Sequence, residues 1–254
     1  MRRFVSLQFS ALLFLGGALA DAHADEVKAL FPAAMRHAMA ELVPKFEQSS
    51  GHRLKIEFGT VGAIMDKLKK AEAVDVVVVT DERLAELISQ GRVYSDGHAV
   101  VAQVGIGVFG RKGESKPDIA SVEALRQALL GAKAIVYGDP ALGDSSGIFA
   151  AGLVERLGIA AEMKPKTKLV HAAGKGQMVE SGGADIGFDQ MSNVVVNPKL
   201  EPLGRLPAAL QHYTKYAGGV TSSAAGAEAG KALIQFLRSP TSQSAMRAKG
   251  FEAL

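Results

Sequence analysis

The stretch VDVVVVT, residues 74–80, decides the fold class of this chain. Residues 76–79 are all valine, so a strand formed by them presents no polar face to water. An uninterrupted apolar strand is typical of a parallel sheet covered by helices on both faces, whereas a strand with one wet face alternates polar and apolar residues. The sequence therefore predicts an α/β protein with a buried parallel sheet.

Segments with helical periodicity separate the predicted strands, which supports the same fold class. Residues 38–51, AMAELVPKFEQSSG, place Met39, Leu42 and Phe46 on one stripe of a helix that ends at Gly51. Further helical segments are expected at 59–73, 82–91, 121–131, 147–158 and 228–239, and extended segments at 53–58, 101–110, 132–139, 166–174, 184–190 and 213–222.

Two extended segments predict a division into two lobes. VAQVGIGVFG at 101–110 and YTKYAGGV at 213–220 are both apolar and glycine-bearing, and they flank a middle segment. If both strands cross between lobes, residues 25–103 plus 218–254 form one lobe and residues 104–217 form the other. Periodicity permits this discontinuous arrangement without requiring it.

Residues 1–24 have the order of a secretory signal peptide: two arginines, an apolar run and the small-residue cleavage pattern Ala22-His23-Ala24. We expect the mature chain to begin near Asp25 and to be periplasmic. No later segment approaches the roughly 20 apolar residues that a membrane-spanning helix needs, so the mature chain is expected not to insert into a membrane.

Composition excludes several kinds of partner and site. The 29 Lys and Arg residues and 26 Asp and Glu residues are interspersed, which argues against a nucleic-acid partner, since such proteins cluster their basic residues. The chain has no cysteine, and its histidines lack the HxH or HxxxH spacing of metal ligands. We therefore expect no metal and no cofactor. A Walker motif is absent from the sequence, so phosphoryl transfer is not indicated.

Anion-binding positions are expected where a strand ends and a helix begins. The first N–H groups of a helix have no partner within it, and they carry a partial positive charge. In FPAAMRHAM, residues 31–39, Arg36 can hold a carboxylate and His37 can donate or accept a proton near neutral pH. Both residues can equally be solvated side chains of a first helical turn.

In open parallel sheets a ligand binds in a crevice beyond the carboxyl ends of the strands. Two further strand-to-helix junctions offer polar groups to this predicted crevice. In FGTVGAI, residues 58–64, Thr60 can cap a helix and Gly62 permits close backbone approach. In GFDQMS, residues 187–192, a strand ends beside Gln190. A simple cap and a simple turn explain these two stretches nearly as well as ligand contact does.

The loop YGDPALGDSSGI, residues 137–148, contains more polar groups than a helix start requires. Asp144 alone can cap the helix that follows. Ser145 and Ser146 then remain as hydroxyl donors next to unpaired backbone N–H groups, which favours contact with an anion.

A glycine-rich stretch supplies two more candidates. VHAAGKGQM, residues 170–178, places His171 and Lys175 after another predicted strand. A glycine-flanked lysine is ordinarily a solvated loop charge, but here the strand end directs it toward the predicted crevice.

The order of these segments resembles that of the molybdate-binding-protein-like group of periplasmic solute-binding proteins. The stretches that carry the resemblance are KALFPAAMRHAMAEL, KIEFGTVGAIMDKL, DVVVVTDERLAEL, YGDPALGDSSGIFAAGLVERLGI and ALIQFLRSPTSQSAMRAKGFE. They extend over essentially the whole chain after the predicted signal peptide. The resemblance implies a type II periplasmic binding protein fold, in which two α/β lobes are joined by two crossing strands and enclose a ligand cleft.

The first loop departs from the pattern of true molybdate binders. Their loop resembles AAASL, with a small hydroxyl donor and no charged side chain, whereas here AAMRH introduces Arg36 and His37. A guanidinium and an imidazole suit a larger molecule that carries carboxylates. The expected partners are therefore a small organic polycarboxylate anion, such as a tricarboxylate, and an ABC-type permease that takes it up, and the expected state is a monomer.

The same group contains aconitate isomerase, a periplasmic enzyme that looks like a binding protein and interconverts cis- and trans-aconitate without a cofactor. The resemblance leaves this activity as the alternative, with His37 or His171 as the base that removes an allylic proton. In either function the expected ligand-binding residues are Arg36, Thr60, Gly62, Ser145, Ser146, Lys175 and Gln190.

Overall fold

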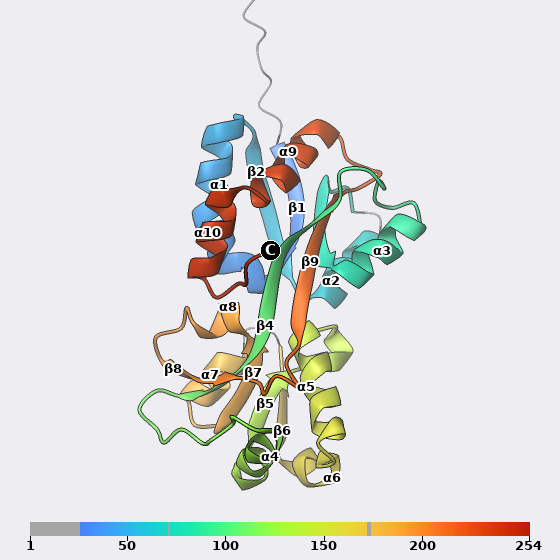
Figure 1. The fold of residues 1–254 in the computed structure, drawn as a ribbon. Helices are drawn as coiled ribbons and strands as arrows, with labels where there is room; N and C mark the ends of the chain where they lie inside the picture. Colours follow the sequence, from blue (N-terminus) through green and yellow to red (C-terminus); the bar gives the residue numbers. More distant parts are fainter. Residues whose placement is uncertain (1–25, 71, 172–173) are drawn as a thin grey trace, which may run out of the picture.

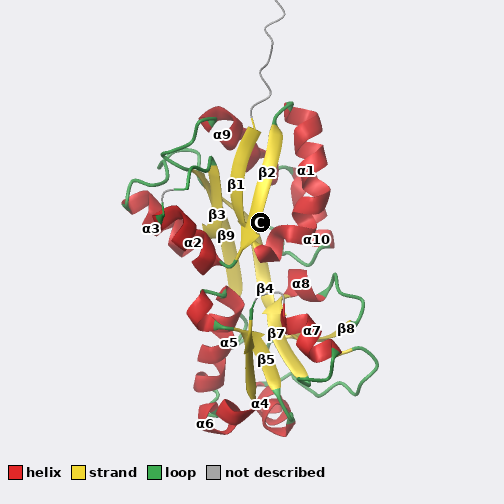
Figure 2. Ribbon diagram, turned by 180° about the vertical axis from the view of Figure 1, so that it is seen from behind, coloured by secondary structure: helices red, strands yellow, loops and turns green. Residues whose placement is uncertain are grey.

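The computed structural model describes residues 26–70, 72–171 and 174–254. The predicted signal peptide lies outside the described residues. Figure 1 shows two lobes, one above the other, with two long strands running between them. Each lobe is a sheet flanked by helices on both sides, as the view from behind also shows (Figure 2). The predicted α/β class and the two-lobed architecture are confirmed.

The first lobe is built on the parallel strands β2, β1 and β3, in that spatial order. They span Glu26–Pro32 (β1), Arg53–Gly59 (β2) and Val76–Thr80 (β3). The valines of β3 are fully buried, as the unbroken apolar run predicts. β9, Tyr213–Val220, pairs antiparallel with β3 and so brings the C-terminal part of the chain back into this sheet.

Helices cover this first sheet. They are α1 (Arg36–Ser50), α2 (Val61–Lys69), α3 (Asp81–Ser89), α9 (Ala227–Leu237) and α10 (Pro240–Ala248). The predicted stripe of α1 is buried, and the helix ends where Gly51 takes a left-handed φ of 75°. A 3-10 turn, η1 (Ala33–Met35), connects β1 to α1.

The second lobe repeats the pattern on a smaller sheet. Its strands are β5 (Ile135–Gly138), β6 (Thr167–Val170), β7 (Ile186–Gln190) and β8 (Leu200–Arg205), with β5 parallel to both β6 and β7. Its helices are α4 (Val122–Gly131), α5 (Ser145–Arg156), α6 (Ala160–Met163), α7 (Gly174–Glu180) and α8 (Met191–Val194), with 3-10 turns η2 (Pro140–Leu142) and η3 (Lys164–Lys166).

The strand β4, Ala99–Arg111, belongs to both lobes. It pairs with β9 up to Gly105 and with β7 from Ile106 onward. The hydrophobic core divides in the same region, because Val104 packs in the core of the first lobe and Ile106 in that of the second. The lobe boundaries proposed from the sequence, after residues 103 and 217, lie within β4 and β9.

Within the described part of the chain, every helix is too short or too polar to cross a membrane.

Candidate functional site

Adjoining cavities lie where the two lobes meet. A small one, of about 30 Å³, is bounded by Ala33 and Thr60 of the first lobe and by Ser145 and Lys175 of the second. A larger one, of about 570 Å³, opens beside it. The two share the residues Ala33, Gly59, Thr60, Asp189 and Asn193. A third cavity, of about 660 Å³, lies beyond Thr60 and also reaches Ser145 and His171.

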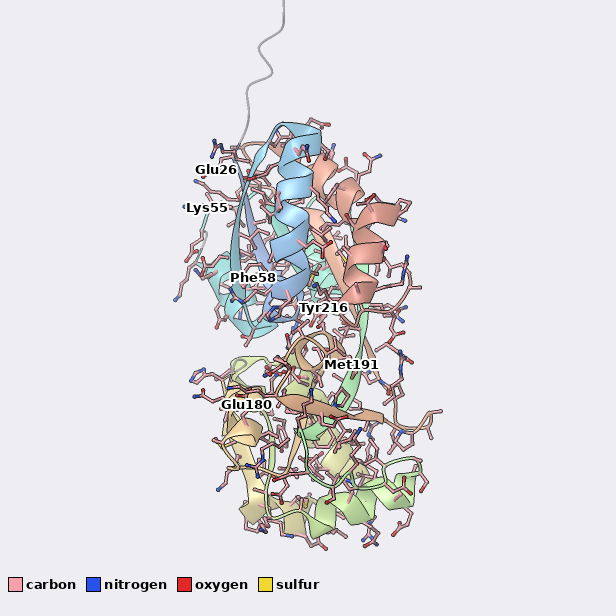
Figure 3. All side chains as sticks on the ribbon, turned by 90° about the vertical axis from the view of Figure 1, so that its left-hand side faces the viewer. Glu26, Lys55, Phe58, Glu180, Met191 and Tyr216 are labelled. Atoms are coloured by element: carbon pink, nitrogen blue, oxygen red, sulfur yellow. The ribbon has the colours of Figure 1, made fainter. Side chains whose placement is uncertain are left out.

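The walls of these cavities come from the carboxyl ends of parallel strands. β1 and β2 lead into the turns that open α1 and α2, while β5, β6 and β7 lead into the starts of α5, α7 and α8. This is the edge at which open α/β sheets hold ligands. In Figure 3, Phe58 and Tyr216 lie at the edge of the upper lobe that faces Met191 of the lower lobe.

The lobes touch each other beside the small cavity. Thr60 Oγ1 donates a hydrogen bond to the Leu142 carbonyl oxygen at 2.8 Å, and the Gly62 N–H donates to the Gly143 carbonyl oxygen at 3.3 Å. Thr60 also caps α2, as predicted, by accepting from the Ala63 N–H at 3.0 Å. These bonds join the start of α2 to the η2 turn, so the cleft is closed on this side.

The close approach depends on two glycines. A Cβ atom on Gly62 would lie 2.6 Å from the Leu142 oxygen, and one on Gly143 would lie 2.4 Å from the Gly62 Cα. Gly143 also takes a left-handed φ of 67°, which disfavours other residues. In this structure Gly62 therefore contacts the opposite lobe, whereas the sequence places it among the ligand-binding residues.

The structure brings three predicted residues to the larger cavity from opposite lobes. Arg36 and His37 reach it from the start of α1, and His171 reaches it from the end of β6. The guanidinium carbon of Arg36 lies 4.5 Å from the centre of the Phe58 ring, which is a cation–π contact. Among the described residues, no carboxylate forms an ion pair with Arg36.

Lys175 has a different environment from the loop charge that the sequence suggests. It is 2% exposed, and its Nζ atom lies 3.0 Å from Asp144 Oδ2, 2.9 Å from Asp189 Oδ1 and 2.9 Å from Ser146 Oγ. An ammonium group has three protons, so these contacts use all of them. In this conformation Lys175 organises the wall of the small cavity.

Ser146 belongs to the same buried cluster. Its hydroxyl donates to Asp144 Oδ1 at 2.6 Å and accepts from Lys175, and the side chain is 1% exposed. Asp144 caps α5 through the Gly147 N–H at 2.8 Å, as the sequence allows, and in addition pairs with Lys175. Both serines line the small cavity, and Ser145, which is partly exposed, also lines the third one.

The ionisation of the cluster follows from burial and pairing. Burial raises the pKa of the Asp144 carboxyl, but the Lys175 charge and the hydrogen bonds from Ser146 and Gly147 outweigh it, so the net pKa is lowered. Burial is the dominant effect on Asp189 and raises its pKa. The pKa of Lys175 is raised, because its two carboxylate neighbours outweigh the cost of burial. Lys175 is thus a cation and cannot act as a base.

Gln190 connects the cavity wall to the crossing strand β9. Its Nε2 lies 3.1 Å from Ser145 Oγ, 3.3 Å from Thr214 Oγ1 and 3.2 Å from Tyr216 Oη. Its Oε1 is buried and has no partner among the described residues. Burial raises the pKa of Tyr216, so its hydroxyl stays protonated and available as a donor.

Sequence reasoning missed Phe58, Asn193 and Tyr216 as parts of the site. Phe58 ends the predicted strand 53–58 directly before the Thr60 turn, so its position beside a strand end is the signal that could have found it. Asn193 follows the GFDQMS stretch by one residue. Tyr216 lies in a predicted crossing strand, and a polar aromatic residue there is a sign of a cleft wall.

The described residues contain no group of three or more histidine and acidic side chains arranged to hold a metal ion. Arg36, His37 and the Ser145 hydroxyl at the cavities are groups of the kind that hold an organic anion, and the carboxylates of Asp144 and Asp189 lie beside them.

Comparison with known proteins gives the family. The family model described as "Bacterial extracellular solute-binding protein" matches residues 27–252. The chain belongs to this family. Among curated relatives, aconitate isomerase of a Pseudomonas species is 29% identical to this solute-binding protein over 218 aligned residues. The alignment covers 84% of this chain and 82% of the relative.

Solved structures show the same fold. The Azotobacter vinelandii periplasmic molybdate-binding protein aligns with a TM-score of 0.76 at 17% identity, covering 90% of this chain and 99% of the other. The sulfate-binding protein of Mycobacterium tuberculosis aligns with a TM-score of 0.74 at 14% identity, and the alignment covers 91% of this chain and 87% of the other. The resemblance to the molybdate-binding-protein-like group is therefore confirmed for this solute-binding protein.

Proposed function

We propose that this solute-binding protein captures a small organic polycarboxylate, such as a tricarboxylate, between its lobes. The observation that carries the proposal is Arg36. Its guanidinium borders the larger cavity and stacks on Phe58, and among the described residues no carboxylate neutralises it. A positioned guanidinium binds a carboxylate through two parallel hydrogen bonds.

The sizes of the cavities fit an anion with more than one carboxylate. The small cavity, at about 30 Å³, has room for a group the size of one or two waters. A single carboxylate there would meet the Ser145 hydroxyl and the first N–H groups of α5. The rest of the molecule would occupy the larger cavity, with a second carboxylate at Arg36.

The place of the protein in the cell is part of the proposal. The family is one of extracellular solute-binding proteins, and the predicted signal peptide supports a periplasmic location. A periplasmic receptor that closes over an anion would deliver it to an ABC-type permease, and we propose that it does so as a monomer.

A second candidate function is isomerisation of aconitate. The observation that favours it is the position of His37 and His171, which line the same cavity from opposite lobes. One neutral imidazole could remove an allylic proton from the substrate, and a proton would then return at the other carbon as the double bond moves. Arg36 would stabilise the enolate-like charge that forms between these two steps. The relative named aconitate isomerase supports this candidate.

The experiment that separates the functions uses the purified mature protein. Calorimetric titration with citrate, cis-aconitate and trans-aconitate is expected to show saturable binding, and Arg36→Ala is expected to weaken it. Molybdate and sulfate serve as comparison anions. Binding of these two alone, with no binding of any tricarboxylate, would overturn the polycarboxylate proposal.

Turnover is measured in the same samples by chromatography of the two aconitate isomers. Conversion that is lost in His37→Ala or His171→Ala, and kept in His98→Ala, would establish the isomerase. His98 is a suitable control because it lies outside the three cavities and bonds to the Ser95 carbonyl oxygen. Binding without conversion would leave a receptor.

A further inference from the structure

The charges behind the cavities do not cancel. Asp144, Lys175 and Asp189 form one buried cluster, exposed by 6%, 2% and 5%, and two carboxylates share a single ammonium group. With both acids ionised, the cluster carries one net negative charge. Asp189 lines both the small and the larger cavity, so an anion in either one would lie against that charge. Like charges in a buried site disfavour joint ionisation.

The two oxygens of Asp189 have different roles. Oδ1 accepts from Lys175 Nζ at 2.9 Å, from the Gln190 N–H at 2.7 Å and from Asn193 Nδ2 at 3.1 Å, and Ser146 Oγ lies 3.3 Å away. Oδ2 forms no hydrogen bond or ion pair with any described residue. One oxygen is therefore saturated by donors, whereas the other is left for a proton.

Asp144 cannot take this proton equally well. Its Oδ1 accepts from Ser146 and from the Gly147 N–H, and its Oδ2 accepts from Lys175. Oδ1 already accepts from two donors, and a proton on Oδ2 would weaken the charge-assisted bond that this oxygen accepts from Lys175. Burial raises the pKa of Asp189, in agreement with this difference.

We propose that the cleft binds its anionic ligand together with one proton, which Oδ2 of Asp189 carries and donates to a ligand carboxylate. The inference rests on the proposed function, because it requires an anion in the cleft. The added proton neutralises the cluster and turns a repelling carboxylate into a hydrogen-bond donor. A carboxylic acid kept neutral by its surroundings can serve as such a donor.

Other titratable groups border the same space and must be separated from Asp189. Tyr216 faces it from β9, Arg36 and His37 face the larger cavity from α1, and His171 faces it from the end of β6. Burial raises the pKa of Tyr216 and keeps its hydroxyl protonated, so the two histidines are the groups that compete with Asp189 as proton carriers.

The coupling between ligand binding and proton binding predicts the direction in which affinity changes with pH. A proton that binds with the ligand makes affinity highest at low pH. Above the pKa that Asp189 has in the free protein, the dissociation constant rises by about tenfold per pH unit. The loss ends at the higher pKa that Asp189 has in the complex. Measurements span about pH 5 to 9, and the histidine variants described below separate Asp189 from the two histidines.

The experiment is calorimetric titration of trans-aconitate into the mature protein in two buffers that differ in ionisation enthalpy. The difference between the observed heats gives the number of protons taken up. Wild type is expected to take up a proton within this pH range and to lose affinity as the pH rises. No uptake at any pH within the range, with binding intact, would overturn the inference and leave the proposed function standing.

Variants identify the side chain that takes up the proton. Asp189→Asn is expected to bind with no uptake and with a flat pH profile, whereas the double variant His37→Gln/His171→Gln keeps the uptake. Asp139→Asn, which replaces an acid that caps the η2 turn outside the cavities, is the matched control and keeps the uptake as well. Uptake that persists in Asp189→Asn would overturn the inference.

Two further outcomes are possible, and each one decides whether the inference stands. If Asp189→Asn does not fold, the histidine double variant decides: retained uptake supports Asp189, and lost uptake overturns it. If wild type binds no tricarboxylate at any pH, the proposed function fails and the inference fails with it. That result is distinct from binding without proton uptake.

Discussion

Replacing Gly62 by alanine should weaken ligand binding while leaving the fold intact. The added Cβ would lie 2.6 Å from the Leu142 carbonyl oxygen and 2.8 Å from the Gly143 Cα, whereas ordinary contact begins at 3.4 Å. Both neighbours are backbone atoms, which cannot move aside as a flexible side chain can. The start of α2 and the η2 turn must then separate, and the cleft cannot close fully on this side.

The magnitude follows from the two bonds that the separation breaks. These are the hydrogen bonds from Thr60 Oγ1 to the Leu142 oxygen and from the Gly62 N–H to the Gly143 oxygen. At about 0.5–1.5 kcal/mol each, the closed state loses about 1–3 kcal/mol. Ligand affinity should fall by about 5- to 150-fold, because the ligand binds the closed state. The fold itself should lose nothing, since alanine in a helix is favoured over glycine by about 0.5–1 kcal/mol.

The assay compares Gly62→Ala with Gly152→Ala by calorimetric titration of trans-aconitate and by thermal unfolding of the ligand-free proteins. Gly152 lies in α5, and a Cβ added there meets nothing within 4 Å. Both variants should unfold at or above the wild-type temperature, but only Gly62→Ala should bind weakly. Small-angle scattering with saturating ligand should show a more extended Gly62→Ala. Wild-type affinity in Gly62→Ala would refute the reasoning.

Three other outcomes are expected. Arg36→Ala should reduce tricarboxylate affinity about tenfold or more, since a hydrogen bond to a charged group contributes about 1.5–3 kcal/mol, and Arg36→Lys should restore only part of it in calorimetric titration. Lys175→Met should lower the free energy of unfolding in urea by about 3–5 kcal/mol, because it leaves two buried carboxylates without a cation, whereas Lys45→Met, at an exposed pair, should change it by about 0.5 kcal/mol or less. Asp189 has a raised pKa, so the folded state holds its proton more tightly than the unfolded state does. As pH rises from the ordinary Asp pKa of 3.8 toward the raised value, wild type should lose stability relative to Asp189→Asn; a constant difference between their urea midpoints would contradict this.

Much of the fold could be predicted from the sequence because local patterns record it. The valines of β3 are buried on both faces, α1 ends at Gly51, and Thr60 caps α2. Each of these features depends on residues that are neighbours in the chain, so periodicity and capping rules reach them. The two crossing strands were also recognisable, as apolar, glycine-bearing segments placed around a middle segment.

The candidate site could be predicted only as a set of strand ends. The sequence placed Arg36, His37 and His171 at such ends, and the structure brings all three to one cavity. It could not show that Lys175 is buried. Glycines surround that lysine in the chain, and a lysine in a glycine-rich loop is ordinarily solvated. Its partners Asp144 and Asp189 arrive from other strand ends.

The sequence by itself determined the α/β class and the strand ends at which a ligand can bind, and it permitted a division into two lobes. Only the tertiary structure decided which polar groups are left for that ligand. In the folded chain, the three ammonium protons of Lys175 are all used by Asp144, Asp189 and Ser146. Arg36 has no ion pair among the described residues, and Gly62 contacts Gly143 of the opposite lobe. The physical reason is that the ionisation and availability of a side chain depend on burial and on partners that folding brings from distant positions.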